Sequence, residues 1–116
     1  MYKRQVVNLS PLHTFSFENK KVYISNGAGY IVINKASDLK NKVKLPDHIS
    51  LELVVGEDKF KLKTKVINYK YNYRIFLSRS IIRSLEEEYK LNKDNLEGDV
   101  TIEVWREEAR AKVKIK

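Results

Sequence analysis

The segment 103–116 repeats the pattern of the segment 52–65, and the two align without a gap. Each copy of a repeat is one folding unit that buries its apolar face against the other copy, so a duplication constrains the fold more than any single motif. The identical pairs are Glu52 and Glu103, Glu57 and Glu108, Lys61 and Lys112, Lys63 and Lys114, and Lys65 and Lys116, while Lys59 matches Arg110. The sequence therefore predicts two related halves.

A second correspondence lies upstream, where residues 30–35 match residues 74–79. Each is an apolar strand closed by a polar residue and a base, and each is followed by a helix-like segment. The offset between the halves changes within residues 86–95, a region where an insertion costs little. We expect a single domain over 1–116 with repeats at about 21–66 and 67–116. Residues 1–20 are expected to form an N-terminal strand pair or arm, with strands near 2–8 and 12–17.

Each half is expected to contain two strands, a helix and two more strands. In the first half, the glycine-containing turn at 26–29 and the turn at 56–58 predict hairpins. Ser37 is expected to cap a short helix that ends before Pro46, and residues 80–89 of the second half predict a longer helix. The expected fold is mainly β with two helices, as duplicated β-β-α-β-β units that form a small pseudo-twofold β-barrel.

The formal net charge of +8 is concentrated in the first half of the chain, where residues 1–50 hold eight bases against three acids. A basic domain of this size attracts polyanions, of which nucleic acid is the commonest. The chain has no cysteine, which excludes disulfides and thiolate metal sites and fits a reducing compartment. No apolar run is long enough to span a bilayer, and no signal peptide opens the chain, so we expect a cytoplasmic protein without a membrane partner. Abundant Lys and Glu with little Gly are typical of a thermophile.

Both halves have a strand that ends in an apolar-polar-base triplet, Ile33-Asn34-Lys35 and Leu77-Ser78-Arg79. In the second half, a helix, a Gly-Asp step and alternating apolar residues over 98–104 follow the triplet. This order resembles the AbrB/MazE/SpoVT family of swapped-hairpin DNA-binding domains, and the Met-Tyr-Lys-Arg opening is similar to the start of some archaeal proteins of that superfamily. Family members usually have one repeat and dimerise, so the resemblance implies a fused pseudo-dimer that binds DNA through its triplet bases and the hairpins before its helices.

Tyrosines and bases alternate over residues 69–74, where cations can meet phosphates while rings meet sugars or bases. Tyrosines also fill strands without any ligand, so this stretch has two interpretations. With the triplet bases that the resemblance implies, the expected nucleic-acid-binding residues are Lys20, Lys21, Lys35, Lys40, Lys70, Tyr71, Tyr73, Arg74, Arg79 and Arg83.

The lysine stripes 59–65 and 110–116 also allow two interpretations. A row of cations at period two can follow a phosphate backbone. Alternatively, the stripes are solvated sheet faces in which Glu52 and Glu103 lie across the hairpin from lysines.

No nucleophile, base and orienting group come together in the sequence, so we expect no enzyme, no metal and no cofactor. Three functions stay open. The first is an AbrB-like transcription regulator or architectural protein bound to double-stranded DNA, either as a single chain or as a homodimer. The second is a protein-interaction module, such as an antitoxin or a small subunit of a nucleic-acid-processing complex. The third is a binder of single-stranded nucleic acid or RNA.

Overall fold

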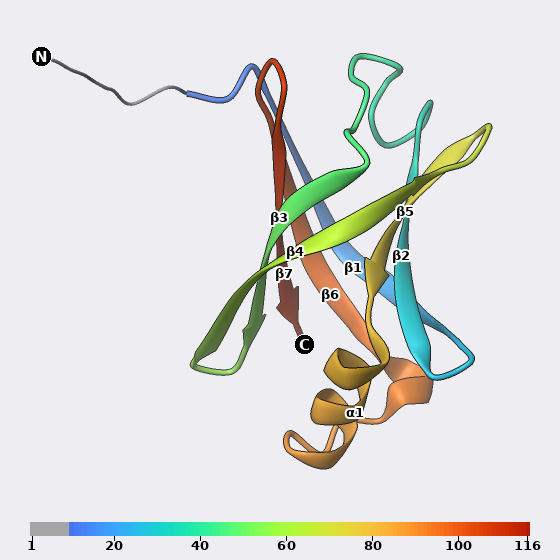
Figure 1. Cartoon of the computed structure of the whole chain (residues 1–116), viewed down its shortest axis with the longest axis vertical. Coiled ribbons are helices and arrows are strands. Elements are labelled where there is room, and N and C mark those ends of the chain that lie inside the picture. The colour runs from blue at the N-terminus through green and yellow to red at the C-terminus, as the bar shows by residue number, and fades with distance from the viewer. Residues whose placement is uncertain (1–9) are drawn as a thin grey trace, which may run out of the picture.

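A computed structural model describes residues 10–116 as a closed β-barrel of seven strands with one α-helix (Figure 1). Around the barrel the strands follow the order β1-β2-β5-β4-β3-β7-β6, and β6 pairs with β1 to close it. The strands are β1 (His13–Ser25), β2 (Ala28–Asn34), β3 (His48–Val55), β4 (Asp58–Asn68), β5 (Asn72–Leu77), β6 (Glu97–Val104) and β7 (Ala109–Ile115). The helix α1 (Arg79–Glu87) and a 3-10 turn (Lys93–Asn95) connect β5 to β6.

Two long strands take part in both walls of the barrel. Residues 13–21 of β1 pair with β6, whereas residues 22–25 pair with β2. Residues 58–65 of β4 pair with β3, whereas residues 66–68 pair with β5. We call the wall of β6, β7, β3 and the first parts of β1 and β4 sheet A, and the wall of β2, β5 and the last parts of β1 and β4 sheet B.

A bulge bends β1 at the point where it leaves sheet A. Its pairing with β6 shifts register between Phe17 and Lys20, and Asn19 has a positive φ of 56°. An extra residue in one strand bends it and increases its twist, which a barrel corner requires. Asp99 fixes this corner, because the Asn19 N–H donates to its Oδ1 at 3.1 Å and its carboxylate lies 3.3 Å from Lys116 Nζ.

The two expected hairpins of the first half are confirmed. Asn26 and Gly27 form a two-residue turn between β1 and β2, with φ of 53° and 82°. A type I′ turn needs positive φ at both central residues, which explains the Asn-Gly pair. Gly56, with φ of 61°, begins the equally short turn between β3 and β4.

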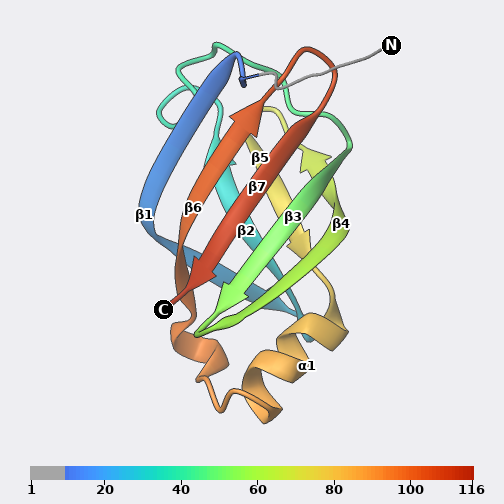
Figure 2. The same cartoon turned by 90° about the vertical axis from the view of Figure 1, so that its left-hand side faces the viewer.

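Alternating apolar residues of all seven strands fill the barrel, and further side chains close both ends. Leu39 and Leu45 come from the connection between β2 and β3 at one end. Ile82 and Leu85 of α1, with Leu96, come from the other end, where α1 lies beneath the strands (Figure 2). A fully buried Leu or Ile contributes about 1.5–3 kcal/mol, so the side chains that close the two ends of the barrel contribute to the stability of the fold.

The helix expected after Ser37 is wrong, because residues 35–41 form consecutive turns. Lys40 and Asn41 both have positive φ, 57° and 55°, which no right-handed helix allows. Asp38 stabilises this path, since its carboxylate accepts the Asn34 N–H at 2.7 Å and pairs with Lys20 Nζ at 2.6 Å. Leu39 is fully buried, but it lies on a turn and not on a helix.

The expected pseudo-twofold barrel of duplicated β-β-α-β-β units is also wrong. The alignment equates β7 with β4, yet β7 lies between β6 and β3 and runs parallel to β3, whereas β4 continues from β3 to β5. The hairpin registers differ too, since Glu52 lies opposite Lys61 while Glu103 lies opposite Arg110. A four-residue connection between β6 and β7 replaces the two-residue turn, and this causes the shift.

Only one strand of the expected N-terminal pair can be compared with the structure. Residues 12–17 fall largely in β1, where they pair with β6. The other expected strand, 2–8, lies outside the described residues.

Asp99→Asn is expected to change how stability depends on pH. The Asn19 N–H and then the Lys116 ammonium lower the pKa of Asp99, so its ionised form favours the folded state. This contribution is complete above the ordinary carboxyl range and is lost as pH falls through the lowered pKa of Asp99. Urea unfolding at about pH 6 and about pH 3 should show less acid destabilisation in Asp99→Asn than in the parent protein. An equal loss of stability at low pH in the variant and in the parent protein would contradict the role of Asp99. Glu103→Gln is the matched control.

Candidate nucleic-acid interface

A row of stacked aromatic and guanidinium groups crosses the outer face of sheet B. Tyr23 of β1 and Tyr30 of β2 are cross-strand neighbours whose rings lie 5.4 Å apart at an interplanar angle of 18°. The Arg74 guanidinium of β5 lies 4.6 Å from the ring centre of Tyr30 and 4.4 Å from that of Tyr69. We call Tyr23, Tyr30, Arg74 and Tyr69 the tyrosine ladder. Lys21 extends it at one end, with Nζ 5.2 Å from the Tyr23 ring centre.

The ladder fixes the position of Arg74. Two tyrosine rings lie against its guanidinium, and its Nε is buried without a hydrogen-bond partner among the described residues. A guanidinium is a planar fork of donors that matches phosphate oxygens, and stacking restricts its orientation in advance. A contact between Arg74 and a ligand would therefore cost little side-chain entropy.

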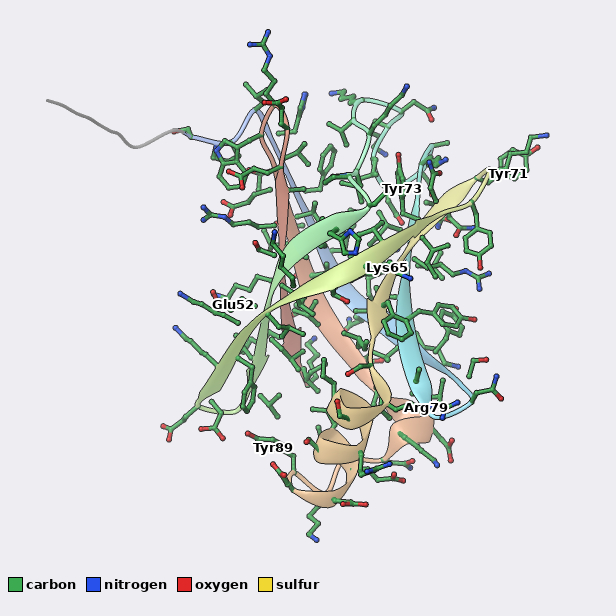
Figure 3. All side chains as sticks on the ribbon, in the orientation of Figure 1. Glu52, Lys65, Tyr71, Tyr73, Arg79 and Tyr89 are labelled. Carbon is green, nitrogen blue, oxygen red and sulfur yellow. The ribbon has the colours of Figure 1, made fainter. Side chains whose placement is uncertain are left out.

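The connection between β4 and β5 places a second cation and a free ring beside the ladder. Tyr71 is 72% exposed, and Lys70 Nζ lies 5.3 Å from its ring centre. Lys35, at the end of β2, donates to Asn68 Oδ1 at 2.6 Å and lies against Tyr73, which ties β2 to this connection. Figure 3 shows Tyr71 projecting from the end of the barrel opposite α1.

The strands of sheet B bear no carboxylate. No Asp or Glu occurs in the sequence between Glu18 and Asp38, or between Asp58 and Glu86. The bases of these two stretches are Lys20, Lys21, Lys35, Lys59, Lys61, Lys63, Lys65, Lys70, Arg74, Arg79 and Arg83. A polyanion on this face would therefore meet cations and aromatic rings without like-charge repulsion from the same strands.

Two residues expected at the interface have other roles. Tyr73 points into the barrel with 3% of its surface exposed, so its ring is unable to stack on a ligand. Lys20 is held in the ion pair with Asp38. Lys40 is exposed on the connection between β2 and β3, where its ammonium donates to the Ser37 carbonyl at 3.0 Å.

Arg79 and Arg83 lie on α1, far from Tyr71 (Figure 3). The strands β2 and β5 are antiparallel, with Gly29 opposite Leu77 and Asn34 opposite Asn72. Lys35 follows β2 at one end of the barrel, and Arg79 follows β5 at the other. The two triplet bases therefore do not share a surface.

Two ladder residues, Tyr23 and Tyr30, were not predicted from the sequence, whereas Tyr69 begins the stretch 69–74 that the sequence singled out. A signal for the first pair exists, because a two-residue Asn26-Gly27 turn places Tyr23 directly opposite Tyr30. The approach of Arg74 to Tyr30 depends on the pairing of β2 with β5, which the local sequence does not specify.

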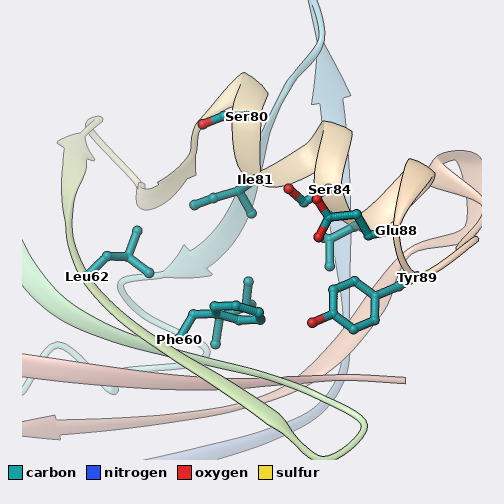
Figure 4. Close-up of a pocket in the computed structure, with 9 residues that line it drawn as sticks. Phe60, Leu62, Ser80, Ile81, Ser84, Glu88 and Tyr89 are labelled. Atoms are coloured by element: carbon teal, nitrogen blue, oxygen red, sulfur yellow. The ribbon is translucent and has the colours of Figure 1, made fainter.

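A separate cavity of about 190 Å³ lies between α1 and the β3–β4 hairpin (Figure 4). Leu53, Phe60, Leu62 and Ile81 give it a largely apolar lining. At its rim the Tyr89 hydroxyl donates to Asp58 at 2.6 Å, which raises the pKa of Tyr89 to about 12. The Asp58 and Glu88 carboxylates make this cavity unsuited to a polyanion.

Within residues 10–116, no three His, Asp or Glu side chains come together as metal ligands. No helix in this part of the chain is both long and apolar enough to cross a membrane.

Comparison of the chain with protein-family models, with curated proteins and with solved structures finds no match. The resemblance to the AbrB/MazE/SpoVT family therefore stays a prediction.

Arg74→Ala is expected to lower the free energy of unfolding by about 1–2 kcal/mol, because it removes a cation from between two tyrosine rings. Urea unfolding measures this change. Lys70→Ala is the control, since Lys70 is exposed and lies against a single ring; its effect should stay within about 0.5 kcal/mol. Equal effects of the two substitutions would show that the ladder adds no stability.

Proposed function

We propose that this protein binds single-stranded nucleic acid along the tyrosine ladder and the β4–β5 connection, and that it acts by binding rather than by catalysis. The supporting observation is the combination, at a sheet whose strands bear no carboxylate, of an exposed ring, Tyr71, with a guanidinium stacked against two tyrosine rings. Aromatic platforms beside cations are the common means by which proteins hold single strands.

The residues have different parts in this proposal. The Tyr30 ring contacts Tyr23 on its β1 side and Arg74 on its β5 side, so Tyr30 positions its neighbours. Tyr71 and the free face of Tyr69, which is 43% exposed, offer stacking surfaces to bases. Arg74, Lys70 and Lys21 supply the positive charge for phosphates.

The projecting Tyr71 favours a single strand over a duplex for this face. Bases in a duplex are stacked on one another, so an exposed ring gains a stacking partner only from an unpaired base. Each such stack contributes about 1–3 kcal/mol and depends little on which base is present.

A transcription regulator of AbrB type is not part of this proposal. That hypothesis required two equivalent halves, and the strand order does not provide them. The competing hypothesis is a protein-interaction module, and the following experiment distinguishes it from single-strand binding.

Tyr71→Ala should weaken binding of a fluorescein-labelled single-stranded oligonucleotide by about 1–3 kcal/mol, because one stacked base loses its partner. Fluorescence anisotropy at two salt concentrations measures this loss. Lys70→Gln should instead make the logarithmic salt dependence shallower by about 0.7, the value for one phosphate of a single strand.

Tyr71→Phe is the matched control, because it retains the ring and should retain the affinity. Lys59→Gln, at the α1 end of the barrel, should leave binding unchanged. The absence of binding at low salt would contradict the proposal and favour the interaction module.

A further inference from the structure

The outer face of sheet A bears two basic rows on strands that are not neighbours. One row, on β4, is Lys59, Lys61, Lys63 and Lys65. The other is Arg110, Lys112 and Lys114 of β7 with Lys116, the residue after it. The strand β3 lies between them, so the rows are about 10 Å apart, and successive cations within a row are about 6.6 Å apart.

A hollow of about 630 Å³ lies between the rows at the level of Ser50. Ser50 pairs with Lys63 on one side and with Arg110 on the other, and its small side chain leaves space between these long ones. The next positions along the rows, Lys61 and Lys112, also line the hollow. Four cations therefore line the hollow, together with the two acidic residues Glu52 and Glu103.

Cross-strand ion pairs do not account for these cations. Glu52 lies opposite both Lys61 and Lys112, yet within the described residues its carboxylate has no nitrogen partner inside 4.0 Å. Of the two rows, only Lys116 has such an ion pair with another described residue, Asp99. Arg110 is oriented by the Trp105 ring, whose centre lies 4.7 Å from its guanidinium carbon.

We propose that this face is a second binding surface, whose partner is the sugar-phosphate backbone of a nucleic-acid duplex. Two cationic rows about 10 Å apart can reach phosphates on both sides of a minor groove about 6 Å wide. Sheet A lacks the exposed tyrosines of sheet B, and Trp105 at the end of its rows lies against Arg110, so the face offers charge, as backbone contacts require. This inference is independent of single-strand binding by sheet B.

The test measures binding of a blunt, labelled DNA duplex by anisotropy. Lys61→Gln combined with Lys112→Gln should weaken binding at least tenfold at low salt. It should also make the logarithmic salt dependence shallower by about 2, because two phosphate contacts are lost. A single-stranded oligonucleotide should bind this variant as well as it binds the parent protein.

Glu52→Gln distinguishes this proposal from a purely structural role of the lysines. Removing a negative charge about 6 Å from a phosphate should tighten duplex binding about threefold. If the lysines serve only as cross-strand partners of Glu52, the substitution lowers stability in urea and leaves duplex binding unchanged, which overturns the proposal.

Two further results would overturn it. One is an equal loss of single-strand binding in the double variant, because the two surfaces would then not be separate. The other is binding of phosphatidylserine vesicles, but not of duplex, in a way that depends on Lys61 and Lys112, since the face would then meet a membrane. Retained duplex binding by Tyr71→Ala would support two independent surfaces, even if single-strand binding itself is not observed.

Discussion

The structure depends on one constraint: β1 and β4 each take part in both sheets. These strands form the two corners at which sheet A meets sheet B, so neither sheet has a free edge at these corners. The bulge at Asn19, held by Asp99, bends the first corner. At the second corner, the Thr64 hydroxyl of β4 donates to the Phe76 carbonyl of β5. Closure buries one side of every strand and leaves two outer faces of different chemistry.

Local features of the structure were predictable, whereas the meeting of distant strands was not. The Asn26-Gly27 turn and the helical spacing of Ile82 and Leu85 depend on neighbouring residues, and both predictions are confirmed. The pairing of β2 with β5 and the parallel contact of β7 with β3 depend on barrel closure, which no short segment encodes. A positive φ is uncommon for lysine, so nothing in the sequence indicated the turn at Lys40 that stands in place of the expected helix.

The same limit explains the mixed outcome for the candidate site. Residues 69–74 do lie at an exposed, basic end of sheet B, but the chain turns at Tyr69 to Tyr71, so Tyr73 enters the core instead of continuing a tyrosine row. The row exists nevertheless, across strands instead of along one of them, from Tyr23 through Tyr30 and Arg74 to Tyr69. Stacking across strands, together with a local absence of carboxylates, distinguishes this face from the lysine rows of sheet A.

The most direct test of this division is an NMR titration of the labelled protein with a short single-stranded oligonucleotide. The account predicts amide shifts confined to the strands of sheet B and to the β4–β5 connection, at residues 21–35 and 66–77. Shifts centred on β3 and β7, or on α1, would contradict it.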